Sequence, residues 1–301
     1  MAEPAPACWI CASERASFYK AGNGPGELRP DDLRISDDRY GVTLALWRCD
    51  DCGFIYADRG EVENLTELYA ALEDPDYLEG EESRARQMRW LLELARELHP
   101  EARSGLDIGA ASGLLVSEAR ATGLEMVGVE PSRSLVEAAQ RDRGVDLLQG
   151  VYPHPELEGR VFDLVFLVDV IEHVADPLAL LEACRQALAP GGRALVVTPD
   201  IGSPTARVLG HRWWHLRLAH VGYFNSQSFG TAAARAGLRV LNETRARWFF
   251  PVGYLARRVE QYLPVRWLNN LVEATPLVRR SFGVEIPLNL HDSTVFTLEA
   301  V

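Results

Sequence analysis

The sequence predicts an α/β protein in which a doubly wound, mainly parallel sheet follows a small metal-binding head. From Ser104 onward, apolar strand segments and amphipathic helical segments alternate at βαβ spacing, and a glycine-bounded turn follows the first strand. Four cysteines fall in two matched pairs near the N-terminus and predict the head. A chain of 301 residues is long enough for one large domain and one small one.

The first 57 residues carry the pairs Cys8 with Cys11 and Cys49 with Cys52. A Cys-x-x-Cys turn places two thiolates on one side, so two such turns complete the tetrahedral shell of a structural zinc ion. The segment between the pairs has few apolar residues and cannot form a stable hydrophobic core by itself. A bound metal ion would supply the missing stability. A redox dithiol is the alternative, although thioredoxin-like motifs occur in βαβ patterns. We predict a zinc-ribbon-like domain with four cysteine ligands over residues 1–57.

Residues 58–100 are predicted to be a helical linker, with helical periodicity over 62–72 and again over 81–98. The sheet domain is predicted over residues 101–301. Its first strand ends at Asp107, and its second runs from Glu125 to Glu130. The further elements, in order, are helices over 114–122 and 132–144, strands over 145–149 and 161–168, a helix opening at Asp176, and strands over 193–198, 237–241 and 293–298.

The turn after the first strand predicts a nucleoside-binding pocket. Gly109 and Gly113 lack Cβ, so backbone N–H groups there can approach a ligand closely. Glu130 ends the second strand, where a carboxylate can accept hydrogen bonds from two ribose hydroxyls. The Gly-x-x-x-Gly spacing differs from the Gly-x-Gly-x-x-Gly pattern that cradles a pyrophosphate, which disfavours NAD and FAD.

Further along the chain, Phe162-Asp-Leu-Val is followed by Asp169-Val-Ile-Glu-His-Val-Ala-Asp-Pro177 and by a Pro-Gly-Gly turn. Together with the glycine turn and Glu130, these residues resemble the class I S-adenosylmethionine-dependent methyltransferases that act on small molecules or sugars. The resemblance covers residues 104–301. It implies a Rossmann-like, seven-stranded sheet with an antiparallel final strand.

The resemblance also implies where S-adenosylmethionine binds. Its methionyl end is expected near Asp107 and Gly109, its ribose at Glu130 and its adenine near Pro131, with the 58–100 linker as a lid. The expected cofactor-binding residues are Asp107, Gly109, Ala110, Ala111, Gly113, Glu130, Pro131, Gly150, Val151, Asp169 and Val170.

Three histidines are candidate general bases, because imidazole titrates near neutral pH. His173 lies in the motif that follows the fourth strand. His215 and His220 lie in an aromatic-rich segment after the fifth strand, where an acceptor would bind. Alternatively, His173 caps a backbone group in its turn and the aromatic segment serves packing. The sequence leaves these alternatives open.

Residues 250–290 are predicted to be a helical insertion that forms a lid over the acceptor. Five arginines against two glutamates in its middle favour an anionic, glycosylated or lipid-linked acceptor, and two ordinary packing helices are the alternative. The net charge of -12 argues against nucleic acid as a partner. No apolar run is long enough to span a membrane, so a cytoplasmic protein is expected.

The sequence therefore predicts an enzyme that transfers a methyl group from S-adenosylmethionine to oxygen, or to carbon, of a small metabolite or a sugar-containing intermediate. A nucleotide-sugar C-methyltransferase is one alternative. The other is a non-catalytic protein in which the zinc ribbon serves docking, since a fold does not fix a function.

Overall fold

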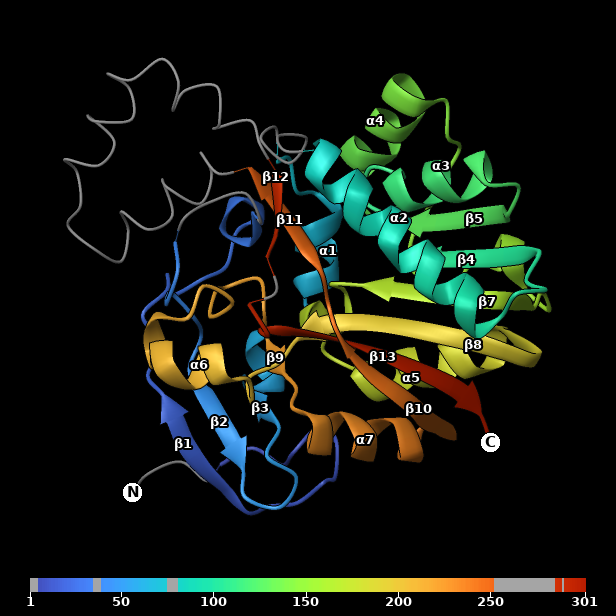
Figure 1. The fold of residues 1–301 in the computed structure, drawn as a ribbon. Helices are drawn as coiled ribbons and strands as arrows, with labels where there is room; N and C mark the ends of the chain where they lie inside the picture. Colours follow the sequence, from blue (N-terminus) through green and yellow to red (C-terminus); the bar gives the residue numbers. More distant parts are fainter. Residues whose placement is uncertain (1–4, 35–38, 75–80, 252–284, 289) are drawn as a thin grey trace.

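The computed structural model describes residues 5–34, 39–74, 81–251, 285–288 and 290–301. The molecule centres on a seven-stranded sheet in the order β10-β13-β8-β7-β4-β5-β6 (Figure 1). Strand β13 is antiparallel to both neighbours, and the other pairs are parallel. The predicted α/β fold is thus confirmed. The strands are β4 (Ser104–Ile108), β5 (Glu125–Glu130), β6 (Leu148–Gln149), β7 (Phe162–Val168), β8 (Leu188–Pro199), β10 (Leu238–Arg245) and β13 (Ser293–Ala300).

Helices cover both faces of this sheet (Figure 1). Alternate residues of β7 point to opposite sides, so Leu164 and Phe166 enter one core while Val165 and Leu167 enter the other. The first core is covered by α2 (Glu81–Leu98), α3 (Leu114–Ala121) and α4 (Arg133–Arg143), and the second by α5 (Pro177–Ala187) and α7 (Ser226–Arg235).

The ends of these helices follow local sequence signals. Ser132 caps α4 by accepting a hydrogen bond from the Leu135 N–H, and Gly144 ends the helix in the left-handed region. The Val145 N–H then bonds back to the helix carbonyl of Ala139. For this reason β6 is shorter than the predicted strand over 145–149.

The helix predicted over residues 62–72 is only partly present. A 3-10 turn over Arg59–Glu61 comes first, and α1 runs over Leu65–Ala70. The Val62 N–H closes the 3-10 turn by bonding to the Arg59 carbonyl, which delays the start of the helix. Helix α2, by contrast, has the predicted bounds.

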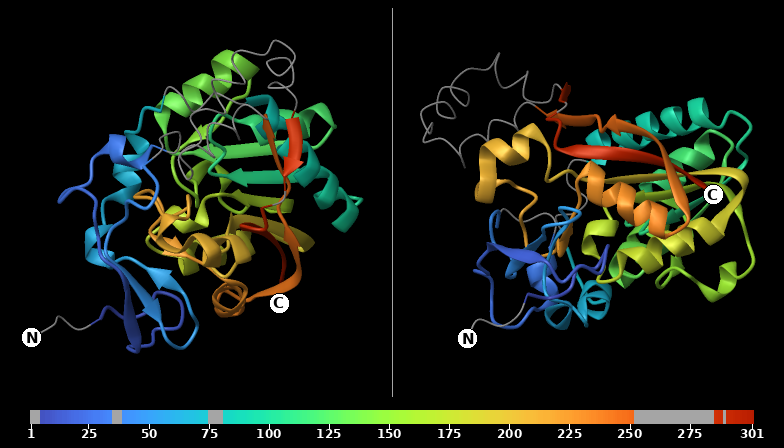
Figure 2. Two further views of the ribbon diagram at one scale, coloured as in Figure 1. Left: turned by 60° about the vertical axis from the view of Figure 1, so that its left-hand side comes forward. Right: turned by 90° about the horizontal axis from the view of Figure 1, so that it is seen from below.

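The described residues between 5 and 57, here called the cysteine head, form a second sheet together with a short strand from residues 222–223. The strands β1 (Ala16–Lys20), β2 (Leu46–Cys49) and β3 (Ile55–Tyr56) pair in that order, and β9 (Gly222–Tyr223) pairs antiparallel with β3. The head lies beside the edge where the parallel strands end (Figures 1 and 2). The loop that returns from the large sheet therefore completes the sheet of the head.

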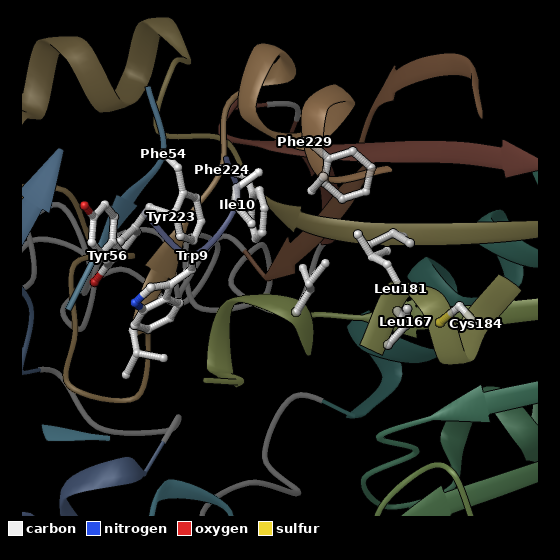
Figure 3. Close-up of a cluster of buried hydrophobic side chains, with 14 of the residues drawn as sticks. Trp9, Ile10, Phe54, Tyr56, Leu167, Leu181, Cys184, Tyr223, Phe224 and Phe229 are labelled. Carbon is white, nitrogen blue, oxygen red and sulfur yellow. The ribbon is translucent and has the colours of Figure 1, made fainter. Parts of the chain in front are cut away.

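The cysteine head and the large sheet share one apolar core. A chain of ring contacts runs from Trp9 through Phe54, Phe224 and Phe229 to Phe296 of β13, with centroid separations of 6.0, 4.7, 5.6 and 3.7 Å. Figure 3 shows the first four of these side chains extending toward Leu181 and Cys184 of α5. Cys184 is fully buried and packs as a core thiol, as its helical position predicts.

Part of the predicted 250–290 insertion forms strands. Strand β11 (Trp248–Pro251) pairs antiparallel with β12 (Glu285–Leu288), so a helical assignment at these two ends is wrong. The predicted helical lid falls mainly on residues 252–284, which lie outside the described residues. Among the helices that are described, none is long and apolar enough to cross a bilayer.

Candidate functional site

The turn over residues 109–113, here called the cofactor turn, joins β4 to α3 in a left-handed backbone path. Its φ angles are 78° at Gly109, 47° at Ala111 and 71° at Gly113. Glycine adopts such values without strain, whereas alanine seldom does. The N–H groups of Gly109 and Ala110 both donate to the Val129 carbonyl, at 2.9 and 3.0 Å. The neighbouring strand β5 therefore fixes the turn.

Glu130, at the end of β5, is fully buried and connects the two strand ends. Its Oε2 accepts a hydrogen bond from the Ala111 N–H, and its Oε1 accepts one from the Ser132 N–H, both at 2.8 Å. Burial raises the pKa of Glu130 to about 7, and the two N–H donors act in the opposite direction. Each carboxylate oxygen keeps a second lone pair for a ligand.

The segment after α1 lies over this strand end. The hydroxyls of Ser132 and Ser134 both donate to the Leu72 carbonyl, at 3.3 and 3.1 Å. This contact agrees with the expectation that the linker covers the cofactor, which stays a prediction.

Two more carboxyls lie at the ends of neighbouring strands. Burial, and next the Glu130 carboxyl, raise the pKa of Asp107 to about 8. Asp169 directly follows β7 with a φ of 53°, and its Oδ1 is buried without a hydrogen-bond partner among the described residues. Burial, and next Asp292, raise the pKa of Asp169 to about 7. These groups fit S-adenosylmethionine, whose amino and sulfonium groups carry positive charge and whose ribose carries two hydroxyl donors.

The remaining residues predicted to bind the cofactor surround the same strand ends. A Cβ added at Gly109 would lie only 2.5 Å from Cγ2 of Val170, so a substitution there disturbs packing before it meets a ligand. The Gly150 N–H donates to the Glu130 carbonyl at 3.0 Å, which brings this residue and the exposed Val151 beside Pro131.

The three candidate bases come together. The rings of His173 and His220 meet edge to face at 4.6 Å, and those of His215 and His220 lie nearly parallel at 5.8 Å. We call these three residues, with Glu172 and Asp292, the histidine cluster. It joins the turn after β7, the loop before β9 and the residue before β13.

Only one of the three imidazoles contacts a carboxylate in the described residues. His215 Nε2 lies 3.2 Å from Oδ2 of Asp292, an oxygen that also accepts a hydrogen bond from Trp214 Nε1 at 2.9 Å. His173 Nδ1 instead donates to the Ala219 carbonyl at 2.7 Å. Burial lowers the pKa of His173 to about 4, and burial followed by the His173 ring lowers the pKa of His220 well below its ordinary value.

Reasoning from the sequence missed the two acids of this cluster. Glu172 stands in the recognised motif, but the pattern assigns it no role. Asp292 is 77 positions from its partner His215, and no spacing rule links them. A local signal was available only for Glu172, because it precedes a candidate base.

The four paired cysteines also converge. Their Sγ atoms all lie within 4.8 Å of one another, and no disulfide joins them. Cys8 and Cys52 are 3.6 Å apart, and Cys11 and Cys49 are 3.4 Å apart, close to the ~3.8 Å expected for sulfurs on a tetrahedral zinc ion with bonds of ~2.3 Å. The Cys52 N–H points to Cys49 Sγ at 3.5 Å. The cluster fits the predicted ion.

Comparison with known proteins assigns the larger part of the chain to a protein family. Residues 80–243, more than half of the sequence, match the family model described as a methyltransferase domain. The ubiquinone biosynthesis O-methyltransferase of Parvibaculum lavamentivorans is 36% identical over 98 residues, which are 31% of this chain and 39% of that protein. The enzyme of the same name from Dinoroseobacter shibae is 38% identical over 98 residues, which are 31% of this chain and 40% of that protein.

The match to these curated relatives thus spans about two fifths of their length. Among solved structures, a Thermotoga maritima protein described as an S-adenosylmethionine-dependent methyltransferase, possible histamine N-methyltransferase, is 19% identical. The similarity covers 74% of this chain and 92% of that one, with a TM-score of 0.47. A likeness at this level is too weak to indicate an activity.

Proposed function

Because this chain belongs to the methyltransferase domain family, whose class I members use S-adenosylmethionine, we propose that it methylates a hydroxyl oxygen of a small acceptor. The observation that carries the proposal is the contact between His215 and Asp292 at the carboxyl edge of the sheet. A hydroxyl must lose its proton as the new bond to carbon forms, so it needs an oriented base beside it, and a carbon acid would need one as well. The names of the curated relatives specify O-methyl transfer and support the choice of oxygen.

The strand-end carboxyls are proposed to hold the cofactor. Glu130 accepts hydrogen bonds from the ribose hydroxyls, while Asp107 and Asp169 offset the positive charges of the methionyl end. S-adenosylmethionine, when bound, supplies a methyl group that is already electrophilic. The remaining task of the chain is to align the acceptor, an effect worth up to ~7–11 kcal/mol.

His215 is the proposed general base. If its Nε2–H donates to Asp292, the ring is held in one tautomer and Nδ1 is left to take the proton of the acceptor. His173 and His220 are weaker candidates, because burial lowers the pKa of both rings. The acceptor is proposed to be a small metabolite or a sugar-containing intermediate, and its charge stays open.

We further propose that Cys8, Cys11, Cys49 and Cys52 hold one structural zinc ion. The support is the sulfur geometry, together with the turn after each second cysteine, where Ala12 and Gly53 have φ angles of 59° and 76°. Four thiolates leave no open coordination position, which argues against a catalytic zinc at this place.

Deuterated methyl transfer tests the function. The purified protein is incubated with S-adenosylmethionine bearing a CD3 group and a panel of phenols, catechols and free sugars. Mass spectrometry and NMR then locate the label. Label on oxygen of at least one acceptor is expected, whereas label on carbon or nitrogen would contradict the assignment.

A further inference from the structure

Besides Asp292 Oδ1, three polar atoms of the histidine cluster have no hydrogen-bond partner in the part of the chain that the structure describes. They are Glu172 Oε1, His173 Nε2 and His220 Nδ1, all shielded from solvent. Each of the three side chains has a possible metal-ligand atom within 4.8 Å of those of the other two. A buried polar atom without a partner costs about 1–3 kcal/mol, so three of them on neighbouring side chains indicate a ligand.

The protein fixes the opposite end of each of these side chains. Thr198 donates its hydroxyl to Glu172 Oε2 at 3.0 Å, and His173 Nδ1 donates to the Ala219 carbonyl at 2.7 Å. The backbone of His215 faces the His220 ring and acts to raise its pKa. Because the proton of neutral His173 is on Nδ1, its Nε2 presents a lone pair. Metal-binding histidines are oriented in this way in proteins.

We propose that Glu172, His173 and His220 bind one divalent transition-metal ion through these three atoms. Two imidazoles and one carboxylate suit Zn²⁺, Fe²⁺ or Co²⁺, whereas Mg²⁺ prefers oxygen ligands. Bonds of ~2.0–2.2 Å place ligand atoms roughly 3–4 Å apart, so a pair of atoms at the 4.8 Å limit needs to close by roughly 1–2 Å.

The charges around the site favour a cation. Burial, and next the Asp169 carboxyl, raise the pKa of Glu172 well above its ordinary value. Asp292 acts on Asp169 in the same direction, and the Arg217 guanidinium is the positive group that acts on both histidines. A divalent ion would offset the negative charge of the carboxylates.

The role of the ion rests on the function proposed above. Three protein ligands leave coordination positions open, and a hydroxyl oxygen bound there would have a lower pKa. His215 and Asp292 would then receive the proton beside the metal.

Cobalt binding tests the site without cofactor or acceptor, so failure of methyl transfer leaves the result unaffected. The metal-free full chain is titrated with Co²⁺ alone. Two equivalents are expected, one with intense sulfur-to-cobalt charge-transfer absorption and one with only weak visible bands from nitrogen and oxygen ligands. Glu172→Gln and His220→Ala should each lose the second equivalent and keep the first. His215→Ala, the neighbouring control, should keep both.

Uptake of one equivalent by the wild-type protein, in the thiolate site only, would overturn the proposal. Retention of the second equivalent by both variants would also overturn it. Since a substitution can disturb folding, X-ray absorption of the second equivalent in the wild-type protein gives an independent answer. Imidazole scattering is expected, and a first shell without imidazole contradicts the site.

Discussion

The cofactor turn and the histidine cluster lie at the same edge of the sheet but differ in how their polar groups are satisfied. Glu130 accepts two N–H groups from residues within about one βα unit of it. In the cluster, four buried atoms have no described partner, and the residues come from segments far apart in the sequence. The turn is prepared by its own backbone, whereas the cluster depends on distant parts of the chain and on a ligand.

The cysteine head supplies one of these distant parts. Ala57 donates its N–H to the Val221 carbonyl, and Val221 donates its own N–H to the Glu172 carbonyl, both at 2.9 Å. Strand β3 pairs with β9 directly beyond this point. Unfolding of the head should therefore disturb the histidine cluster more than it disturbs the cofactor turn.

The largest effect is expected from Cys49→Ser. Zinc binding contributes about 10–16 kcal/mol to the folding of small zinc modules, so the variant should lose its metal and the structure of the head. Methyl transfer should fall below detection, while affinity for S-adenosylmethionine stays within a few-fold of wild type. Metal analysis, calorimetry and hydrogen exchange measure the three quantities.

Cys184→Ala is the matched control, because it removes a buried thiol outside the metal set and should keep the zinc. A wild-type protein that is folded and free of metal would contradict the zinc assignment. If Cys49→Ser lost cofactor affinity as completely as it loses methyl transfer, the cofactor turn would depend on the head as much as the histidine cluster does, and the distinction between these two regions would be wrong.

The next largest effect is expected from His215→Ala. Loss of a general base lowers turnover by ~10²–10⁴, and the cofactor affinity should not change because the ring lies outside the cofactor turn. His211→Ala is the control, since that ring packs edge-on against Tyr19 at 5.3 Å. Near-normal turnover in His215→Ala, with a large loss in His173→Ala or His220→Ala, would assign the base to another ring.

A smaller effect is expected from Glu130→Ala, in the other region. Hydrogen bonds to a charged group contribute ~1.5–3 kcal/mol each, so affinity for S-adenosylmethionine should fall at least tenfold while turnover at saturating cofactor is largely kept. Glu137→Ala, an exposed acid on α4, is the control for charge. Equal affinities in the two variants, measured by calorimetry, would remove Glu130 from the cofactor site.

The sequence predicts the cofactor turn well because every determinant is local. Gly109, Gly113 and Glu130 occupy fixed positions relative to β4 and β5, and the cap at Ser132 and the end at Gly144 follow from single residues. The cysteine cluster is equally accessible, since metal-ligand spacing is a local pattern as well.

The cluster could be predicted only as a set of separate candidates. The sequence identifies His173, His215 and His220 but cannot bring them together, because their contacts depend on the pairing of β3 with β9 and on the arrival of Asp292 before β13. The predicted length of β6 was wrong for a related reason, because the Val145 N–H donates to a carbonyl at the end of α4 and not to a neighbouring strand.

The smallest effect is a pH dependence that separates folding from cofactor binding. In the folded protein the pKa of Asp107 rises from 3.8 to about 8 and that of Glu130 from 4.5 to about 7, mainly through burial. A carboxyl with a raised pKa binds more protons in the folded state, so the free protein should become less stable as pH rises from 5 to about 8. The cofactor needs the ionised carboxylates, so its affinity should change in the opposite direction and rise by at least about tenfold between pH 6 and pH 8.

Thermal melting with and without S-adenosylmethionine measures both trends in one experiment. The melting temperature of the free protein should fall over this range, while the increase caused by the cofactor should grow. In Asp107→Asn both the melting temperature of the free protein and the increase caused by the cofactor should change less at the high-pH end of the range. The reason is that the group with the higher pKa no longer titrates. The asparagine should also weaken binding at pH 8 more than at pH 6, where the wild-type carboxyl is already protonated. A cofactor affinity that falls with rising pH would show that the neutral carboxyls bind the ligand, and that the charge argument for the cofactor turn is wrong.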